Sequence, residues 1–337
     1  MKPFLTLATL AAAAGLATSS PVLGQEVVLR FATTNAPTAH LNVQVLVPWA
    51  ERINAEGKGI VRIDVSHGTT LADQSNFYSR VLNDVIQIGW GLQGTIGGKF
   101  PLTEVVSLPF LSQKSEDSSA ALWRLYNSGK LAKEYREVEV LGMVVFPQIS
   151  IHSRKPIKSL ADVKGLKIRA GSNVGSQVIQ GLGASPVSMP TADIYQALAK
   201  GTIDATLVQW TAFQPFKLAE VTTYHLDAPL GASPAMLFMS RKKFDSLPKA
   251  ARDLIMKHSG EAFSRQFGAF WDRVQDGDRK PVVASGKHSA YVVSEQEVAK
   301  WSKVLNGVTE KWVKDTEDGG VILQAYREEL TKSGARK

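Results

Sequence analysis

The stretch VVLRF at residues 27–31 decides the fold, together with the segments that follow it. It is apolar and rich in β-branched residues, which predicts a buried strand. Alternation between periods of about 3.6 and 2 residues then continues along the chain. The resulting order is strand 27–31, helix 41–53, strand 60–65, helix 77–82 and strand 85–90. Such alternation predicts parallel sheets joined by right-handed helical crossovers.

A second cycle of the same kind predicts a second lobe. The helix–turn–strand segment 194–203 lines up with the segment 77–86, and in both an amphipathic helix ends at a residue tolerant of positive φ before a buried strand. The alternative, that any helix–turn–strand unit looks this way, stays open. The elements expected in this cycle are strands 138–146, 149–153, 166–169 and 203–208, with helices 174–182 and 192–200.

Two apolar ridges follow towards the C-terminus. One lies on a long helix over 248–274 and contains three phenylalanines, and the other is marked by Trp301, Leu305, Val308 and Trp312. We expect both ridges to pack on the lobes, with a dimer contact as the alternative. The expected division is a signal peptide 1–24, lobe I 25–146 and 235–273, lobe II 147–234 and 274–300, and C-terminal helices 301–337.

The N-terminal segment has the features of a secretory signal peptide. Lys2 precedes an apolar run over 4–17, and small residues follow up to Gly24. The run is shorter than the roughly 20 residues that a membrane-spanning helix needs. It also lacks the polar face of a buried N-terminal helix. We therefore expect cleavage near Gly24 and a soluble, exported chain.

Composition excludes several classes of site. The 337 residues contain no cysteine, so disulfides, thiolate metal sites and thiol nucleophiles are impossible. Six histidines form no metal-binding pair motif, and we expect no metal and no cofactor. The net charge of +8 is spread along the chain, whereas a nucleic-acid-binding protein concentrates its basic residues.

Catalytic motifs are also absent from the sequence. No GxSxG motif occurs, and the glycines of 94–99 do not have the spacing of a phosphate-binding loop. Gly171 and Gly175 are interpreted as tight turns, although the helix start after Asn173 could present N–H groups to an anion.

Arg169 is the residue most suggestive of a ligand. It lies at the carboxyl end of the apolar strand 166–169, which is the end of a parallel sheet where ligands bind. A guanidinium at that place can grip a carboxylate through two parallel hydrogen bonds. A structural ion pair is the alternative for an arginine at a strand end.

Several ordered motifs give the chain a family resemblance. They are HG at 67–68 with LAD at 71–73, LPFL at 108–111, LADVKGLKIR at 160–169, LGASP at 182–186 with MP at 189–190, and IYQAL at 194–198 with Gly201 and Asp204. In this order, behind a signal peptide, the chain resembles the substrate-binding proteins of tripartite ATP-independent periplasmic (TRAP) transporters, of the dicarboxylate-binding type.

The resemblance implies a two-lobed periplasmic binding protein fold, each lobe a mainly parallel sheet flanked by helices. It implies a non-catalytic receptor in the periplasm that closes on an organic acid and delivers it to the TRAP membrane permease. Arg169 matches the family's carboxylate-gripping arginine. We expect a monomer rather than a dimer. The alternatives are an exported hydrolase or lyase acting on a small carboxylic acid, and a sensor lobe for a kinase.

Departures from the family pattern narrow the expected ligand. Relatives that bind sugar acids have an arginine in the strand that here contains Gln148 to His152, and some have an acid where Leu92 stands. The loss of these polar groups favours an aromatic or branched monocarboxylate, a 2-oxo acid included, because a polyhydroxylated acid would keep unpaired hydroxyls. The expected ligand-binding residues are Arg169, Gln209, Trp210, Ser172, Trp90, Gln93, Gln74, Asn35, Thr34, His40 and Gln148. For His40 a surface role, and for Trp90 and Trp210 a core role, are the alternatives.

Overall fold

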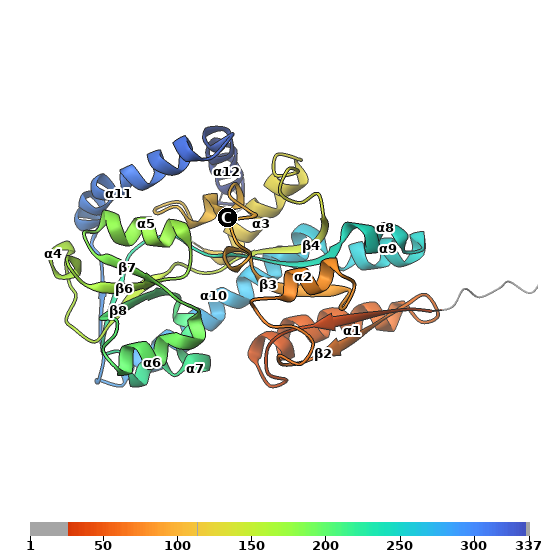
Figure 1. The fold of residues 1–337 in the computed structure, drawn as a ribbon, viewed down its shortest axis with the longest axis horizontal. Helices are drawn as coiled ribbons and strands as arrows, with labels where there is room; N and C mark the ends of the chain where they lie inside the picture. The colour runs from red at the N-terminus through yellow and green to blue at the C-terminus, as the bar shows by residue number, and fades with distance from the viewer. Residues whose placement is uncertain (1–25, 113, 335–337) are drawn as a thin grey trace, which may run out of the picture.

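The computed structural model describes residues 26–112 and 114–334 and shows two α/β lobes (Figure 1). Lobe I is built on a five-stranded sheet in the order β2–β1–β3–β10–β4, and lobe II on a six-stranded sheet in the order β11–β9–β5–β8–β6–β7. The first sheet consists of β1 (Val27–Ala32), β2 (Val61–Ser66), β3 (Ile88–Leu92), β4 (Val138–Val145) and β10 (Pro234–Ser240). The second consists of β5 (Ser150–Ser153), β6 (Lys167–Ala170), β7 (Ser185–Ser188), β8 (Ala205–Val208), β9 (Tyr224–Asp227) and β11 (Ser289–Val292). The predicted signal peptide lies outside the described residues.

Each sheet is mainly parallel and contains one reversed strand. β1 pairs in parallel with β2 and β3, whereas β10 is antiparallel to β3 and β4. In lobe II, β5 is antiparallel to β8 and β9. The reversed strands follow the short connections 146–149 and 228–233, by which the chain passes between lobes without a crossover helix. The prediction of two mainly parallel sheets is confirmed.

Helices cover the faces of both sheets, as expected. Those of lobe I are α1 (Val47–Glu56), which a π-helical turn over Asn42–Leu46 precedes, α2 (Phe77–Leu82), α3 (Ser115–Asn127), α8 (Arg241–Ser246) and α9 (Lys249–Lys257). Those of lobe II are α4 (Leu160–Val163), α5 (Asn173–Gly181), α6 (Ile194–Ala199) and α7 (Phe213–Phe216). Within 26–112 and 114–334, no helix combines the length and apolarity that crossing a bilayer requires.

The helix α10 (Gly260–Ala284) runs along both lobes (Figure 1). The predicted helix 248–274 is divided at residues 258–259 and continues ten residues beyond its expected end, past Pro281. Phe267 and Phe270 are buried in the core of lobe I, and Val282 packs against an apolar cluster of lobe II. Gly268 permits a close approach to α3, because a Cβ there would lie 2.4 Å from the Ser115 carbonyl oxygen.

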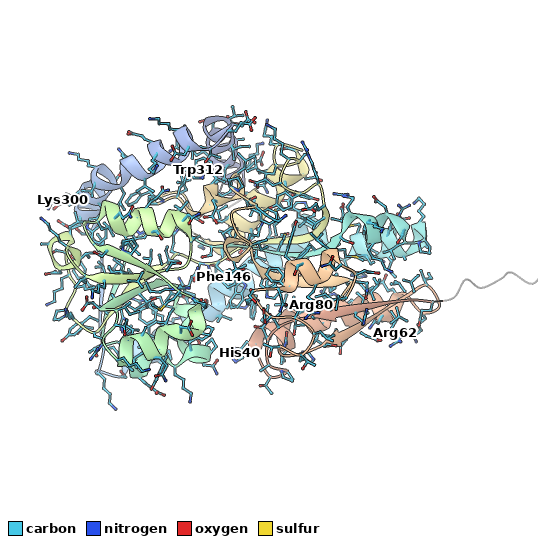
Figure 2. All side chains as sticks on the ribbon, viewed as in Figure 1. His40, Arg62, Arg80, Phe146, Lys300 and Trp312 are labelled. Atoms are coloured by element: carbon cyan, nitrogen blue, oxygen red, sulfur yellow. The ribbon has the colours of Figure 1, made fainter. Side chains whose placement is uncertain are left out.

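The C-terminal helices α11 (Glu295–Asp315) and α12 (Gly319–Gly334) pack on both lobes. α11 contacts α5 of lobe II, and α12 contacts α3 of lobe I. The predicted ridge on α11 is buried, and the Trp312 indole donates to the Pro101 carbonyl at 3.2 Å. Figure 2 shows Trp312 and Lys300 along this helix. The expectation that both ridges pack on the lobes is confirmed, and each fully buried large apolar side chain stabilises the fold by about 1.5–3 kcal/mol.

Candidate functional site

Arg169 lies on β6, between β7 and β8, at the carboxyl edge of the lobe II sheet. In the parallel register it is opposite Val187 of β7 and Thr206 of β8. Carboxyl ends of parallel strands meet at one edge, so the residues that follow all three strands gather there. These residues are Gly171–Ser172 after β6, Met189–Thr191 after β7 and Gln209–Trp210 after β8.

The Arg169 guanidinium is buried, and its partners among the described residues are neutral. Arg169 is 6% exposed. Nε donates to the Met189 carbonyl at 3.0 Å, and Nη2 donates to Thr191 Oγ1 at 3.1 Å. No carboxylate in the described ranges forms a salt bridge with it, so the alternative of a structural ion pair is not what the geometry shows. Burial lowers the pKa of Arg169 to about 10, which leaves the group charged at neutral pH.

In the turn after β6, the Arg169 guanidinium packs against the backbone of Gly171. A Cβ on Gly171 would lie 3.0 Å from Nη1 and 3.1 Å from Nη2 of Arg169, so any other residue would displace the guanidinium by a few tenths of an ångström. The next residue, Ser172, is the N-cap of α5 and accepts a hydrogen bond from the Gly175 amide at 3.0 Å. Gly171 therefore contributes to the packing of the Arg169 guanidinium as well as to the turn.

The residues after β8 are held by bonds within the protein. Gln209 Nε2 donates to Ser233 Oγ at 2.9 Å. Trp210 is 1% exposed, and its indole donates to Asp227 Oδ1 at 2.8 Å. Asp227 also accepts from Arg279 Nε at 2.9 Å. Trp210 is thus part of an apolar and ion-paired cluster of lobe II, while Gln209 bridges to the connection between the lobes.

Three histidines form a hydrogen-bonded row behind Trp210. His152 Nε2 bonds to the Val208 carbonyl at 3.1 Å, and its Nδ1 is 3.0 Å from His225 Nδ1. His225 Nε2 is in turn 3.1 Å from His288 Nδ1. Burial lowers the pKa of His152 to about 3, so the imidazole is neutral and both of its nitrogens are engaged. His152 has no free nitrogen for acid–base chemistry on a ligand.

The carboxyl edge of the lobe I sheet carries a second polar group of residues. Thr34 adopts a φ of 57° after β1, and its Oγ1 accepts from Gln74 Nε2 at 2.8 Å. Gln74 Oε1 accepts from the Leu92 amide at the end of β3 at 3.3 Å. Asn35 donates to the Thr33 carbonyl at 2.7 Å. The predicted residues of this lobe are therefore gathered at one edge by β1, β3 and the turn before α2.

The two edges come close together next to Gly94. A Cβ built on Gly94, which follows Gln93 in lobe I, would lie 3.7 Å from the Gly171 carbonyl oxygen and 3.7 Å from Ser172 Cβ in lobe II. The same point is 3.6 Å from Glu104 Oε1. The segment that holds the Arg169 guanidinium thus faces lobe I at this place.

The other predicted ligand-binding residues are Trp90, Gln148 and His40. Trp90 is 3% exposed and stacks on Phe267 of α10 with ring centroids 4.7 Å apart. Gln148 lies in the connection between β4 and β5, where it bonds to the Ser112 carbonyl and the Gly231 amide. His40 is exposed before the π-helical turn that leads into α1 (Figure 2). The structure therefore places Arg169, Ser172 and Gln209 at the carboxyl edge of the lobe II sheet, and Thr34, Asn35, Gln74 and Gln93 at the corresponding edge of lobe I.

A family model matches most of the chain. The model for bacterial extracellular solute-binding protein, family 7, matches residues 31–315. The chain belongs to this family. The resemblance to TRAP solute-binding proteins is thereby confirmed, and members of the family are extracytoplasmic solute-binding proteins.

Individual relatives of this family 7 protein agree with the match. It is 29% identical to the outer membrane transporter protein TsaT of Comamonas testosteroni, over 87% of this chain and 88% of that protein. A marine metagenome TRAP solute-binding protein, specific for aromatic acid ligands, is 28% identical with a TM-score of 0.85, over 91% and 99% of the two chains. A TRAP solute-binding protein of Rhodoferax ferrireducens, with copurified benzoate, is 27% identical with a TM-score of 0.85, over 92% and 99%.

Two features of this solute-binding protein escaped the sequence analysis. Glu104 lies on a 3₁₀ turn of lobe I beside Gly94, and no motif marks it. The pair Asp227–Arg279 joins β9 to α10 across 52 residues of sequence. The position of Asp227 at the end of a strand, like that of Arg169, was the available signal.

Proposed function

We propose that this protein is the periplasmic receptor of a TRAP transporter that captures an aromatic monocarboxylate by lobe closure and delivers it to the membrane permease. The observation that carries the proposal is the buried Arg169 guanidinium, which forms no ion pair with an acid of the described residues. A charged side chain buried to this extent is normally paired, because desolvation of an isolated charge is costly. A carboxylate ligand would supply the missing charge through paired hydrogen bonds.

The proposed ligand has one carboxylate and an apolar body. Arg169 places a cation at the carboxyl edge of the lobe II strands, beside amide, hydroxyl and backbone groups. Relatives at 28% and 27% identity are described as specific for aromatic acids and as holding benzoate. Both lines of evidence favour a benzoate-like acid over a sugar acid.

Closure on the ligand requires contacts from both lobes, because a ligand stabilises the closed state only through its differential affinity for that state. We propose that Ser172 and Gln209 from lobe II and Thr34, Asn35, Gln74 and Gln93 from lobe I complete the ligand shell, with Trp90, Trp210, His40 and Gln148 around it. We keep the lobe ranges 25–146 with 235–273 and 147–234 with 274–300 as part of the proposal; the division of strands between the two sheets supports them, apart from Pro234, which begins β10 of the lobe I sheet.

Binding without turnover fits the geometry better than catalysis. A hydrolase or lyase would need a base near the carboxylate of the ligand. His152 has both nitrogens engaged and a lowered pKa, and His40 is exposed. We therefore propose a receptor and not an enzyme, exported by cleavage near Gly24 and acting as a monomer.

The proposal is tested by calorimetric titration of the mature protein with benzoate, followed by mass spectrometry of the recovered acid. We expect saturable binding and the return of unaltered benzoate. In Arg169→Ala the affinity should fall by more than about tenfold, the loss expected when a desolvated charged hydrogen bond is removed. Equal affinity in the variant, or conversion of the acid, would contradict the proposal.

A further inference from the structure

Among the described residues of lobe I, two buried acceptor oxygens near the Arg169 turn accept no hydrogen bond in this structure. They are Oε1 of Gln93 and Oε2 of Glu104. Gln93 is 2% exposed, and it precedes Gly94, whose Cβ position is 3.6 Å from the other oxygen of Glu104. Buried acceptors are paired in the great majority of cases, so two at one place call for an explanation.

The orientation of the Gln93 amide follows from its neighbours. Glu134 accepts from the amide and the hydroxyl of Thr103, at 3.1 and 2.6 Å. Because the Thr103 hydroxyl donates to Glu134, it accepts from the Tyr135 hydroxyl at 2.8 Å. Tyr135 therefore accepts from Gln93 Nε2. This chain of donors fixes the amide nitrogen on Tyr135 and leaves the amide oxygen without a donor.

Glu104 has no cation to neutralise it. No salt bridge to Glu104 is formed within residues 26–112 and 114–334. Burial raises the pKa of Glu104 to about 7; the buried Ser107 hydroxyl, a hydrogen-bond donor, opposes this rise, and the Glu134 carboxylate adds to it. Both the neutral and the ionised carboxyl can accept a hydrogen bond, and the partly neutral form repels an approaching anion less.

We propose that Gln93 and Glu104 form a hydroxyl-recognising subsite that selects organic acids with a hydrogen-bond donor away from the carboxylate. The inference rests on the proposed function, since Arg169 orients the carboxylate and lobe I then receives the other end of the ligand. The best ligands are hydroxylated aromatic acids. An acid without the hydroxyl leaves the two acceptors unpaired on closure, and discrimination follows from that cost.

The test is a comparison of dissociation constants for benzoate and its three monohydroxylated isomers. In the wild type we expect at least one hydroxybenzoate to bind about tenfold or more tightly than benzoate. In Glu104→Leu, which removes both acceptors of the carboxyl, benzoate should bind more tightly because fewer acceptors are left unpaired on closure, and the preference should fall towards the value that Gln93 supports by itself. Glu104→Gln retains one acceptor and should give an intermediate preference.

Glu137→Gln is the matched control, because it removes a lobe I carboxylate that pairs with Lys99 on the surface. It should leave the preference at the wild-type value. Thermal denaturation verifies that each variant folds. The inference is overturned if no isomer is preferred, if Glu104→Leu keeps the preference, or if removal of Glu104 tightens binding of all four acids equally. Benzoate binding that depends on Arg169 would still support the proposed function in those cases, whereas failure to bind any of the acids would overturn both.

Discussion

Arg169 and Arg279 both pack against lobe II, but their charges meet different groups. Arg279 on α10 pairs with Asp227 Oδ2 at 2.9 Å and lies over the Trp210 ring at 5.7 Å. Its side chain is 30% exposed. Arg169 on β6 is 6% exposed, yet its partners within the described part of the chain are a carbonyl and a hydroxyl.

The difference separates a structural arginine from a ligand-binding one. Pairing a partly buried cation with an acid of its own chain offsets desolvation and holds α10 on lobe II. The more buried cation, which needs a counter-charge more, has none from the described residues. The partner of Arg169 is therefore expected from outside the chain.

The most direct way to break this comparison is to remove each arginine in turn. Arg169→Ala should weaken benzoate binding by more than about tenfold and change the free energy of unfolding by less than about 1 kcal/mol, because no paired charge is lost. Arg279→Ala should lower the free energy of unfolding by about 1–2 kcal/mol, because Asp227 loses its cation. Calorimetry and urea denaturation measure both effects. The comparison fails if Arg169→Ala destabilises the fold more than Arg279→Ala does.

Glu104 extends the comparison from an unpaired cation to an unpaired acid. Its pKa is raised to about 7 by burial, so the folded state keeps a proton that the unfolded state releases above its ordinary value of 4.5. Stability should therefore fall as the pH rises through this window. The wild type should lose on the order of 1–3 kcal/mol relative to Glu104→Gln between about pH 5 and pH 8. Glu134, whose pKa burial also raises to about 7, is present in both proteins, so the difference between them reports the Glu104 carboxyl together with its repulsion from Glu134. If the denaturation midpoints of the wild type and Glu104→Gln changed with pH in the same way, the raised pKa of Glu104 would be contradicted.

Gly171→Ala sharpens the comparison by displacing the unpaired guanidinium without deleting it. A Cβ would lie 3.0 Å from Arg169 Nη1, so the guanidinium must move by a few tenths of an ångström relative to Met189 and Thr191. We expect a loss of about threefold to tenfold in benzoate affinity, because the paired hydrogen bonds lose their geometry. Gly277→Ala on α10 is the control, since its Cβ meets no atom within 4 Å. Equal affinities for the two variants would show that the guanidinium tolerates the shift.

Trp210→Phe tests the paired side of the comparison and should have the smallest effect. It removes the indole donor to Asp227 but leaves Arg279 and Ser150 bonded to that carboxylate. The expected loss in the free energy of unfolding is about 1 kcal/mol, the net value of one hydrogen bond. Tryptophan fluorescence during benzoate titration provides a second measurement, in which the wild type should respond more than the variant. A variant with unchanged stability would indicate that the indole hydrogen bond contributes nothing net.

Local periodicity predicted most elements but not all of them. The strands at 27–31, 60–65 and 166–169 and the helix at 174–182 were confirmed to within one or two residues, because alternation and helical spacing are properties of neighbouring residues. β10 was not predicted, although all seven of its residues are buried. A continuously apolar strand has no alternation to identify it, and its reversed direction depends on the connection from the other lobe.

For the candidate site too, the sequence indicated one part and only the structure showed the other. The position of Arg169 at a strand end indicated a ligand role from the sequence. The proximity of Glu104 to the Arg169 turn was not predictable, because it depends on how two lobes meet through residues 67 or more positions apart in the chain.

The sequence by itself determined the two cycles of strand and helix, the absence of thiol chemistry and the presence of an arginine where parallel strands end. The tertiary structure alone decided which charges are paired. A charge finds its partner through contacts between distant segments, as Asp227 does with Arg279, and such contacts leave no local pattern in the chain. For that reason the unpaired state of Arg169, on which the proposed function depends, could be observed only after the lobes were assembled.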